Sequence, residues 1–216
     1  MARRSPLPPP PPPVGTRTWP DRDALLRDRA VALSGLVRAH IGPGRLGALW
    51  LWAACGALGW AVFGVALLVL EEGHGALGTV TGAGLAVLGV CCLVPSAVFV
   101  ALGVVRDRRA RRLLDAWGEL DRDRPADLPL RSPAGSAVWL LLSYGLCAVG
   151  LFVCVGVPAK AVPGEDTYGE VALWMGLGFI AWLTGLIGLV TAFGHRRWVR
   201  RTLAPPVRRA PADAPR

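Results

Sequence analysis

The sequence predicts an all-α polytopic membrane protein, with four transmembrane helices arranged as two sequential hairpins. Apolar residues make up 53% of its 216 positions and a further 27 are glycine, whereas charged residues account for only 18%. The mean hydropathy is +0.44. A soluble domain of this size could not bury so much apolar surface. The apolar residues also gather in four long runs, and the arginines lie between those runs.

Each of the four runs lacks Asp, Glu, Lys and Arg and is longer than the roughly 18 residues that indicate a membrane-spanning helix. The runs cover residues 46–70, 76–105, 136–158 and 171–194. The first, as a helix, would be about 37 Å long, enough to cross a hydrocarbon core of about 30 Å with some tilt.

The positions of the basic residues predict the direction of these helices. All 23 arginines lie in residues 1–45, 106–135 and 195–216, whereas the two remaining loops hold Lys160 and five acidic residues. The positive-inside rule therefore places both termini and the middle loop in the cytoplasm. The strong preference for Arg over Lys, with abundant Ala, Gly and Pro, is typical of a GC-rich bacterial genome, so we expect a bacterial plasma membrane.

We expect six segments along the chain. They are a disordered Pro-rich cytoplasmic tail (1–20), an amphipathic cytoplasmic helix (21–45), a first transmembrane hairpin (46–105), a basic cytoplasmic loop (106–135), a second hairpin (136–194) and a basic Pro-rich tail (195–216). The run from Pro8 to Pro13 favours a polyproline II rod of roughly 19 Å. Such a rod acts either as a spacer or as a ligand for an aromatic groove.

The cytoplasmic segments are amphipathic as well as basic. Leu26, Ala30, Leu33, Val37 and Ile41 share one face of the expected helix. Arginines close to anionic headgroups gain about 1 kcal/mol each, so we expect these segments to lie on the anionic inner leaflet and to bind no nucleic acid. The expected leaflet contacts are Arg106, Arg108, Arg109, Arg111, Arg112, Arg196, Arg197, Arg200 and Arg201. The alternative is that these arginines only set the topology.

A shift of 89 residues without gaps superimposes parts of the two expected hairpins. It pairs Trp50 with Trp139, Gly89 with Gly178, and the arginines that follow each second span. A duplicated two-helix unit would explain this match and predicts a pseudo-two-fold axis along the membrane normal. The alternative is that glycine-rich apolar helices resemble one another by composition alone.

Small residues recur at four-residue spacing within the spans, where they let helix backbones approach closely. The expected packing positions are Ala53, Ala57 and Ala61; Gly78, Gly82 and Ala86; and Thr184, Gly188 and Ala192. They serve either the bundle itself or the seam of a homodimer. Pro95 lies in mid-span and predicts a helix kink, because proline removes one backbone hydrogen bond. The kink is either purely structural or part of a substrate site.

The sequence supplies no catalytic, cofactor or metal motif. Its five cysteines all lie within the spans and its three histidines outside them, which disfavours a disulfide framework or a metal site. No ionisable residue lies inside a span, although proton-coupled and ion-coupled carriers usually need one. Acid and base groups gather only in the outer loops, at Glu71, Glu72, His74, Glu165, Asp166 and Glu170.

These observations favour a small, non-enzymatic membrane protein of the structural or interaction type. Its helices would pack with a second copy or with a larger membrane complex. The alternative is a transport component for a hydrophobic or lipidic substrate that enters near Pro95. A membrane enzyme would need the outer acids and His74 to converge at one site.

Overall fold

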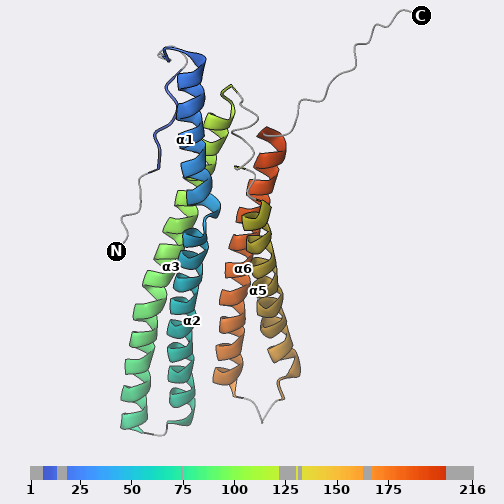
Figure 1. Ribbon diagram of the computed structural model, residues 1–216. Coiled ribbons are helices and arrows are strands. Elements are labelled where there is room, and N and C mark those ends of the chain that lie inside the picture. Colours follow the sequence, from blue (N-terminus) through green and yellow to red (C-terminus); the bar gives the residue numbers. More distant parts are fainter. Residues whose placement is uncertain are drawn as a thin grey trace, which may run out of the picture.

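The computed structural model describes residues 7–13, 19–73, 75–121, 130, 133–162 and 167–202 (Figure 1). Its helices are α1 (Arg22–Ile41), α2 (Pro43–Glu72), α3 (Ala76–Gly118), α5 (Pro133–Lys160) and α6 (Tyr168–Thr202). The four long apolar helices that the sequence predicts are confirmed, because α2, α3, α5 and α6 are each long and apolar enough to cross a membrane.

Local chemistry explains where the first helices begin and end. Asp21 caps α1, since its carboxylate accepts a hydrogen bond from the backbone N–H of Ala24 at 2.6 Å. Gly42 closes α1 through its N–H to the carbonyl of Arg38 at 3.0 Å, and Pro43 opens α2 at a position where no N–H is needed. The expected helix over 21–45 is therefore two helices that meet at Gly42. Gly75 directly precedes α3 and has a φ of 136°, a backbone conformation that favours glycine.

Two of the helices extend well beyond their uncharged runs. α3 has 43 residues and is about 64 Å long, and α6 continues to Thr202. The expected loop at 106–135 is therefore helical as far as Gly118, because the arginines, alanines and leucines of this stretch are strong helix formers. α3 is helical on both sides of Pro95, and the hydroxyl of Ser96 donates to the carbonyl of Cys92 at 2.7 Å. The kink remains a prediction.

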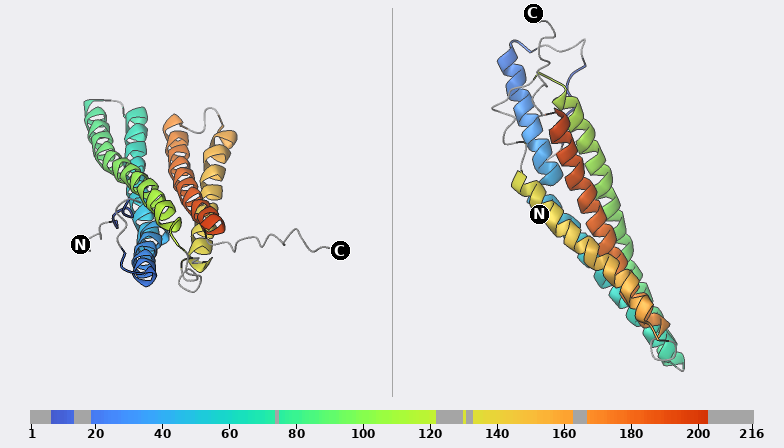
Figure 2. Two further views of the ribbon diagram at one scale, coloured as in Figure 1. Left: turned by 90° about the horizontal axis from the view of Figure 1, so that it is seen from above. Right: turned by 90° about the vertical axis from the view of Figure 1, so that its right-hand side faces the viewer.

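The four long helices lie side by side in the order α3, α2, α6, α5 (Figures 1 and 2). The most extensive helix contacts join α2 with α3, α5 with α6, and α2 with α6. We call the end that holds residues 22–41, 106–118 and 195–202 the arginine-rich end. We call the end that holds residues 71–73, 75–76, 160–162 and 167–170 the acidic end. The arrangement is an open row in which α3 and α5 form the two edges.

The buried core lies at the arginine-rich end and not in the middle of the row. Leu33 and Leu36 of α1 are fully buried there, together with Leu114 and Trp117 of α3 and Trp139 of α5. In the most apolar stretches of the four candidate spans, by contrast, only 11–22% of residues are buried. Lipid tails are as apolar as leucine side chains, so the row gains little from hiding its surface.

Glycines provide the close contacts inside each hairpin. A Cβ atom added to Gly89 of α3 would lie 2.8 Å from the carbonyl oxygen of Gly59 on α2. A Cβ atom on Gly178 of α6 would likewise lie 2.9 Å from the carbonyl oxygen of Gly150 on α5. Each crossing thus joins two glycines. Gly89 and Gly178 are related by the 89-residue shift, whereas Gly59 and Gly150 are not, because the shift equates Gly59 with Ala148.

The hairpins are not, however, related by the expected two-fold axis. The shift equates α2 with α5 and α3 with α6, so a two-fold axis would either join equivalent helices or match a contact of α2 with α6 by an equal contact of α5 with α3. The main contact between hairpins joins α2 with α6, and among the described residues no comparable contact joins α3 with α5. Trp60 of α2 lies against Gly176 of α6 and donates its indole N–H to the carbonyl of Leu173 at 3.0 Å. At the shifted positions stand Val149 and Val87, so this contact exists only once.

Several of the predicted small residues make contacts within the chain. Gly82 lies against the Leu70 side chain, and Gly188 lies against Ser143. Thr184 and Ala192 are buried. Ala53, Ala57, Ala61, Gly78 and Ala86 are half-buried.

The glycine crossing of α5 and α6 makes a stability prediction. A methyl group at Gly150 would overlap the backbone of α6, whose Gly178 carbonyl oxygen would be 2.6 Å away. We expect Gly150→Ala to destabilise the chain by about 1–3 kcal/mol, measured as a lower thermal unfolding midpoint in detergent. Gly145→Ala is the matched control on the same helix, because its Cβ would meet no described atom within 4 Å. Equal midpoints for the two variants would contradict the crossing.

Candidate functional site

The candidate site is at the arginine-rich end, where α1 packs against α3. The predicted apolar face of this helix is real, since Leu33, Val37 and Ile41 are all buried. We expected this apolar face of α1 to lie on the inner leaflet, but it packs against other helices of the protein. The physical reason is that the extended α3 supplies an apolar partner at Leu114 and Trp117.

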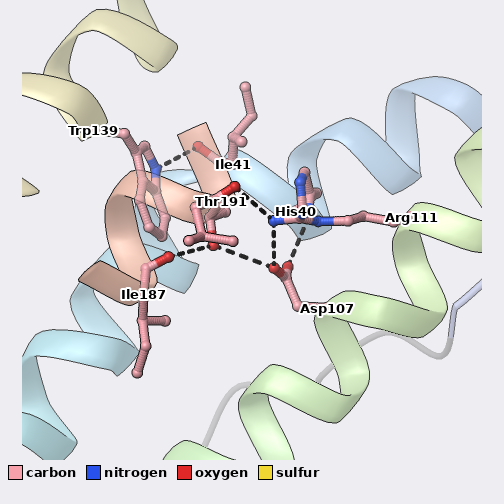
Figure 3. Close-up of polar contacts among 8 residues, drawn as sticks. His40, Ile41, Asp107, Arg111, Trp139, Ile187 and Thr191 are labelled. Carbon is pink, nitrogen blue, oxygen red and sulfur yellow. Dashed lines mark hydrogen bonds and ion pairs between the residues drawn. The ribbon is translucent and has the colours of Figure 1, made fainter. Parts of the chain in front are cut away.

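Packing of α1 on α3 brings His40 next to Asp107. The Nδ1 atom of His40 lies 2.6 Å from the carboxylate of Asp107 (Figure 3). Their side chains are only 1% and 8% exposed. Thr191 of α6 donates its hydroxyl to the same carboxylate at 3.3 Å, and Arg111 lies 3.6 Å from it. One carboxylate therefore joins three helices.

Asp107 lies beyond the uncharged run, which ends at Val105. Burial by itself raises the pKa of Asp107, but the hydrogen bond from His40 and the charges of His40, Arg45 and Arg111 outweigh it, so the pKa is lowered. An ionised carboxylate only accepts hydrogen bonds, so Nδ1 of His40 carries a proton. The stability that this pair contributes is present above the ordinary carboxyl pKa of about 3.9 and is lost as the pH falls through the lowered value.

Arg111 is held in place from two sides. Its Nη2 donates to the carbonyl of Val190 at 3.0 Å, in addition to its ion pair with Asp107. Gly194 of α6 makes room for the guanidinium group, since a Cβ there would lie 2.5 Å from Nη1. Arg111 thus crosses from α3 to α6 in a fixed position.

Two tryptophans tie further segments to this end. Trp139 of α5 donates its indole N–H to the carbonyl of Ile41 at 3.0 Å (Figure 3). Trp117 of α3 donates to the carbonyl of Pro9 at 3.1 Å, so the proline-rich residues 7–13 lie against the protein's own core.

A cavity of about 720 Å³ opens beside this network, between the ends of α3 and α6. His40, Arg111 and Trp198 line it. Its other charged lining residues are Asp115, Glu119, Arg197 and Arg201. Burial raises the pKa of Asp115, and the charge of Glu119 raises it further.

The structure divides the nine predicted leaflet arginines into two groups. Arg106, Arg111 and Arg196 are half-buried, and the other six are exposed. Arg111, Arg197 and Arg201 line the cavity. Contact of any of them with a leaflet remains a prediction.

At the acidic end, one outer carboxylate has a structural role. Glu71 accepts hydrogen bonds at 3.0 and 3.1 Å from the backbone N–H of Gly169, at the start of α6. Glu72 and Glu170 are exposed, while His74, Glu165 and Asp166 fall outside the described residues. No convergent catalytic group is therefore described at this end.

The sequence reasoning missed the pair of His40 and Asp107. These residues are 67 positions apart, and both lie in arginine-rich segments whose pattern indicates topology. One signal was available: Asp107 interrupts a run of arginines one helical turn before Arg111, the spacing of an ion pair on a helix.

Comparison of the chain with protein-family models, curated proteins and solved structures finds no match.

The buried pair predicts a large effect of Asp107→Ala. Removing this carboxylate leaves His40, Thr191 and Arg111 without their shared partner, which costs about 3–5 kcal/mol for a buried pair. Chemical or thermal unfolding in detergent would measure the loss. The control is Asp121→Ala, which breaks an exposed pair with Arg22 and should cost no more than about 1 kcal/mol. Similar losses in both variants would show that the network at Asp107 adds nothing special.

Proposed function

We propose that this chain is a non-enzymatic membrane protein of the structural or interaction type, in a bacterial plasma membrane with both termini in the cytoplasm. The observation that carries the proposal is the open row of helices. α3 and α5 each pack extensively along only one neighbour within the row, so each presents a long side to whatever lies next to it in the membrane.

α5 offers a side that a second helix could approach closely. Leu141 and Phe152 are 73% and 71% exposed and lie on one helix face with Gly145 and Ala148. A Cβ on Gly145 would meet no described atom within 4 Å. Because apolar surface alone does not drive association in lipid, such small residues are the positions at which helices gain contact.

The alternative, transport of a hydrophobic or lipidic substrate past Pro95, has less support. Pro95 is exposed on the outer side of α3. It is not among the described residues that line the cavities of about 480, 720, 610 and 220 Å³.

Photo-crosslinking tests the interaction role. With p-benzoylphenylalanine in place of Leu141 or Phe152, we expect irradiation of native membranes to give a discrete protein adduct, either the dimer or one partner of fixed mass. Val31 is a control, because it is equally exposed at 73% but lies on α1, outside the row. Adducts with lipid alone at both α5 positions would refute the proposal.

Cysteine labelling tests the orientation. In a chain without its native cysteines, Val162→Cys should react with a membrane-impermeant maleimide in intact cells, and Arg112→Cys should react only after lysis. Both positions are exposed and lie at opposite ends of the row. The reverse pattern would overturn the orientation but would leave the row itself unaffected.

A further inference from the structure

Two cavities lie between α3 and α6 at the arginine-rich end. The larger, of about 720 Å³, has a charged and polar lining. The smaller, of about 220 Å³, is lined by the apolar residues Val104, Leu186, Ile187 and Val190 and also by Asp107, Arg108, Arg111 and Thr191. Arg111 lines both cavities, so a polar space and a more apolar space adjoin at one fixed guanidinium group.

Three residues that line the larger cavity have buried polar atoms without a partner among the described residues. The Nε2 of His40, the Nε1 of Trp198 and the Nε of Arg111 have no hydrogen-bond partner among the described residues. His40 is 1% exposed and Trp198 is 8% exposed. The tryptophan and arginine atoms are always donors, and the histidine atom is a donor when the ring is protonated. Buried donors of this kind are costly unless an acceptor satisfies them, so the cavity suits a ligand with several acceptor oxygens.

The charges around the larger cavity define that ligand further. Arg111, Arg197 and Arg201 stand against Asp115, Glu119 and the Asp107 carboxylate that contacts Arg111. When His40 carries protons on both nitrogens, the form in which its Nε2 is a donor, one positive charge is left. A phosphodiester carries one negative charge and matches this balance. A phosphate monoester carries about −1.5 to −2 near neutral pH and would be repelled by the carboxylates.

The depth of the cavities matches a lipid. Arg111 is six residues beyond Val105, the end of the uncharged run, which places it about 9 Å further along the helix. If the uncharged run of α3 ends at the edge of the hydrocarbon core, Arg111 lies at the level of the headgroups. Val104 and Leu186, in contrast, belong to the uncharged runs themselves, whereas Asp107 and Arg108 lie beyond them, so the smaller cavity spans the boundary between the headgroups and the acyl chains.

We propose that a phospholipid binds between α3 and α6, with its phosphodiester at Arg111, His40 and Trp198 and part of one acyl chain along Val104, Leu186 and Val190. The proposal rests on the membrane placement argued above and is independent of any protein partner. Basic pockets between membrane helices are known to hold lipid headgroups. Arg111 is suited to this role because Val190 and Asp107 fix it before the ligand arrives.

Native mass spectrometry of the full chain in detergent tests this site. Titration with dioleoylphosphatidylglycerol should show one lipid bound more tightly than any further ones. We expect Arg111→Gln to weaken this binding about tenfold. We expect Trp198→Phe, which keeps an aromatic ring but removes the indole N–H donor, to weaken it about fivefold. Arg197→Gln should also weaken it. The matched controls are Arg112→Gln and Arg200→Gln, which remove the same charge from exposed neighbours outside the cavity and should stay within about twofold.

Three outcomes would overturn the proposal. Equal weakening by the cavity variants and their controls would mean diffuse attraction to the basic surface. Tighter binding of dioleoylphosphatidic acid than of dioleoylphosphatidylglycerol would refute the preference for a phosphodiester with one negative charge. Displacement of the lipid by inorganic phosphate at similar concentration would indicate a phosphate site without a chain.

Two checks keep the test independent of folding and of the proposed function. Unfolding midpoints of all variants show whether a loss of lipid reflects a loss of fold, and Trp198→Phe and Arg197→Gln break no hydrogen bond described above. Lipid binding with no protein crosslink at α5 would support this site and count against the interaction role. A crosslink without selective lipid binding would do the reverse.

Discussion

The carboxylate of Asp107 is the point on which the arginine-rich end depends. It accepts from His40 of α1 and from Thr191 of α6, and it pairs with Arg111 of its own helix. A buried carboxylate without such partners would be strongly unfavourable. The three partners therefore have to be present together, and this requirement fixes the position of α1 on α3 and of α3 beside α6. The main effect of the network is thus to select one arrangement of the helices, and its net contribution to the free energy of folding is small.

The membrane-spanning part is held by a different kind of contact. Its apolar surface is no more costly against lipid than against protein, so burial cannot choose among the possible arrangements of four apolar helices. The arrangement depends instead on which helix surfaces fit together closely. Glycines at the two crossings bring backbones together, and the contact of Trp60 with Gly176 selects α6 as the neighbour of α2. Because valines occupy the corresponding positions in the other hairpin, the same shape cannot form twice. The hairpins resemble each other while their mutual contact is asymmetric.

This difference also explains how much the sequence could predict. The four spans follow from uncharged runs bounded by residues such as Arg45 and Arg106, and their helical structure follows from the lack of backbone partners in lipid. The order of the helices does not follow, because apolar residues surround each helix and no face is distinguished. The fit of Trp60 into the space at Gly176 depends on two residues more than a hundred positions apart. The break between α1 and α2 had a local signal at Gly42 and Pro43, which the amphipathic pattern of residues 21–45 obscured.

The arginines show why a topological signal can conceal a site. Nine of them were grouped by one property, their position next to the spans, and this property is the same for all nine. What distinguishes Arg111 is its surroundings: the carbonyl of Val190, the carboxylate of Asp107 and the space left by Gly194. An exposed arginine such as Arg112 keeps its conformational freedom and its water, so its attraction to an anion is weak and screened by salt. Arg111 is half-buried and is restrained by Val190 and Asp107, and it lines two cavities. Neighbouring residues of identical chemistry can therefore differ in their surroundings, because the fold restrains Arg111 and leaves Arg112 exposed.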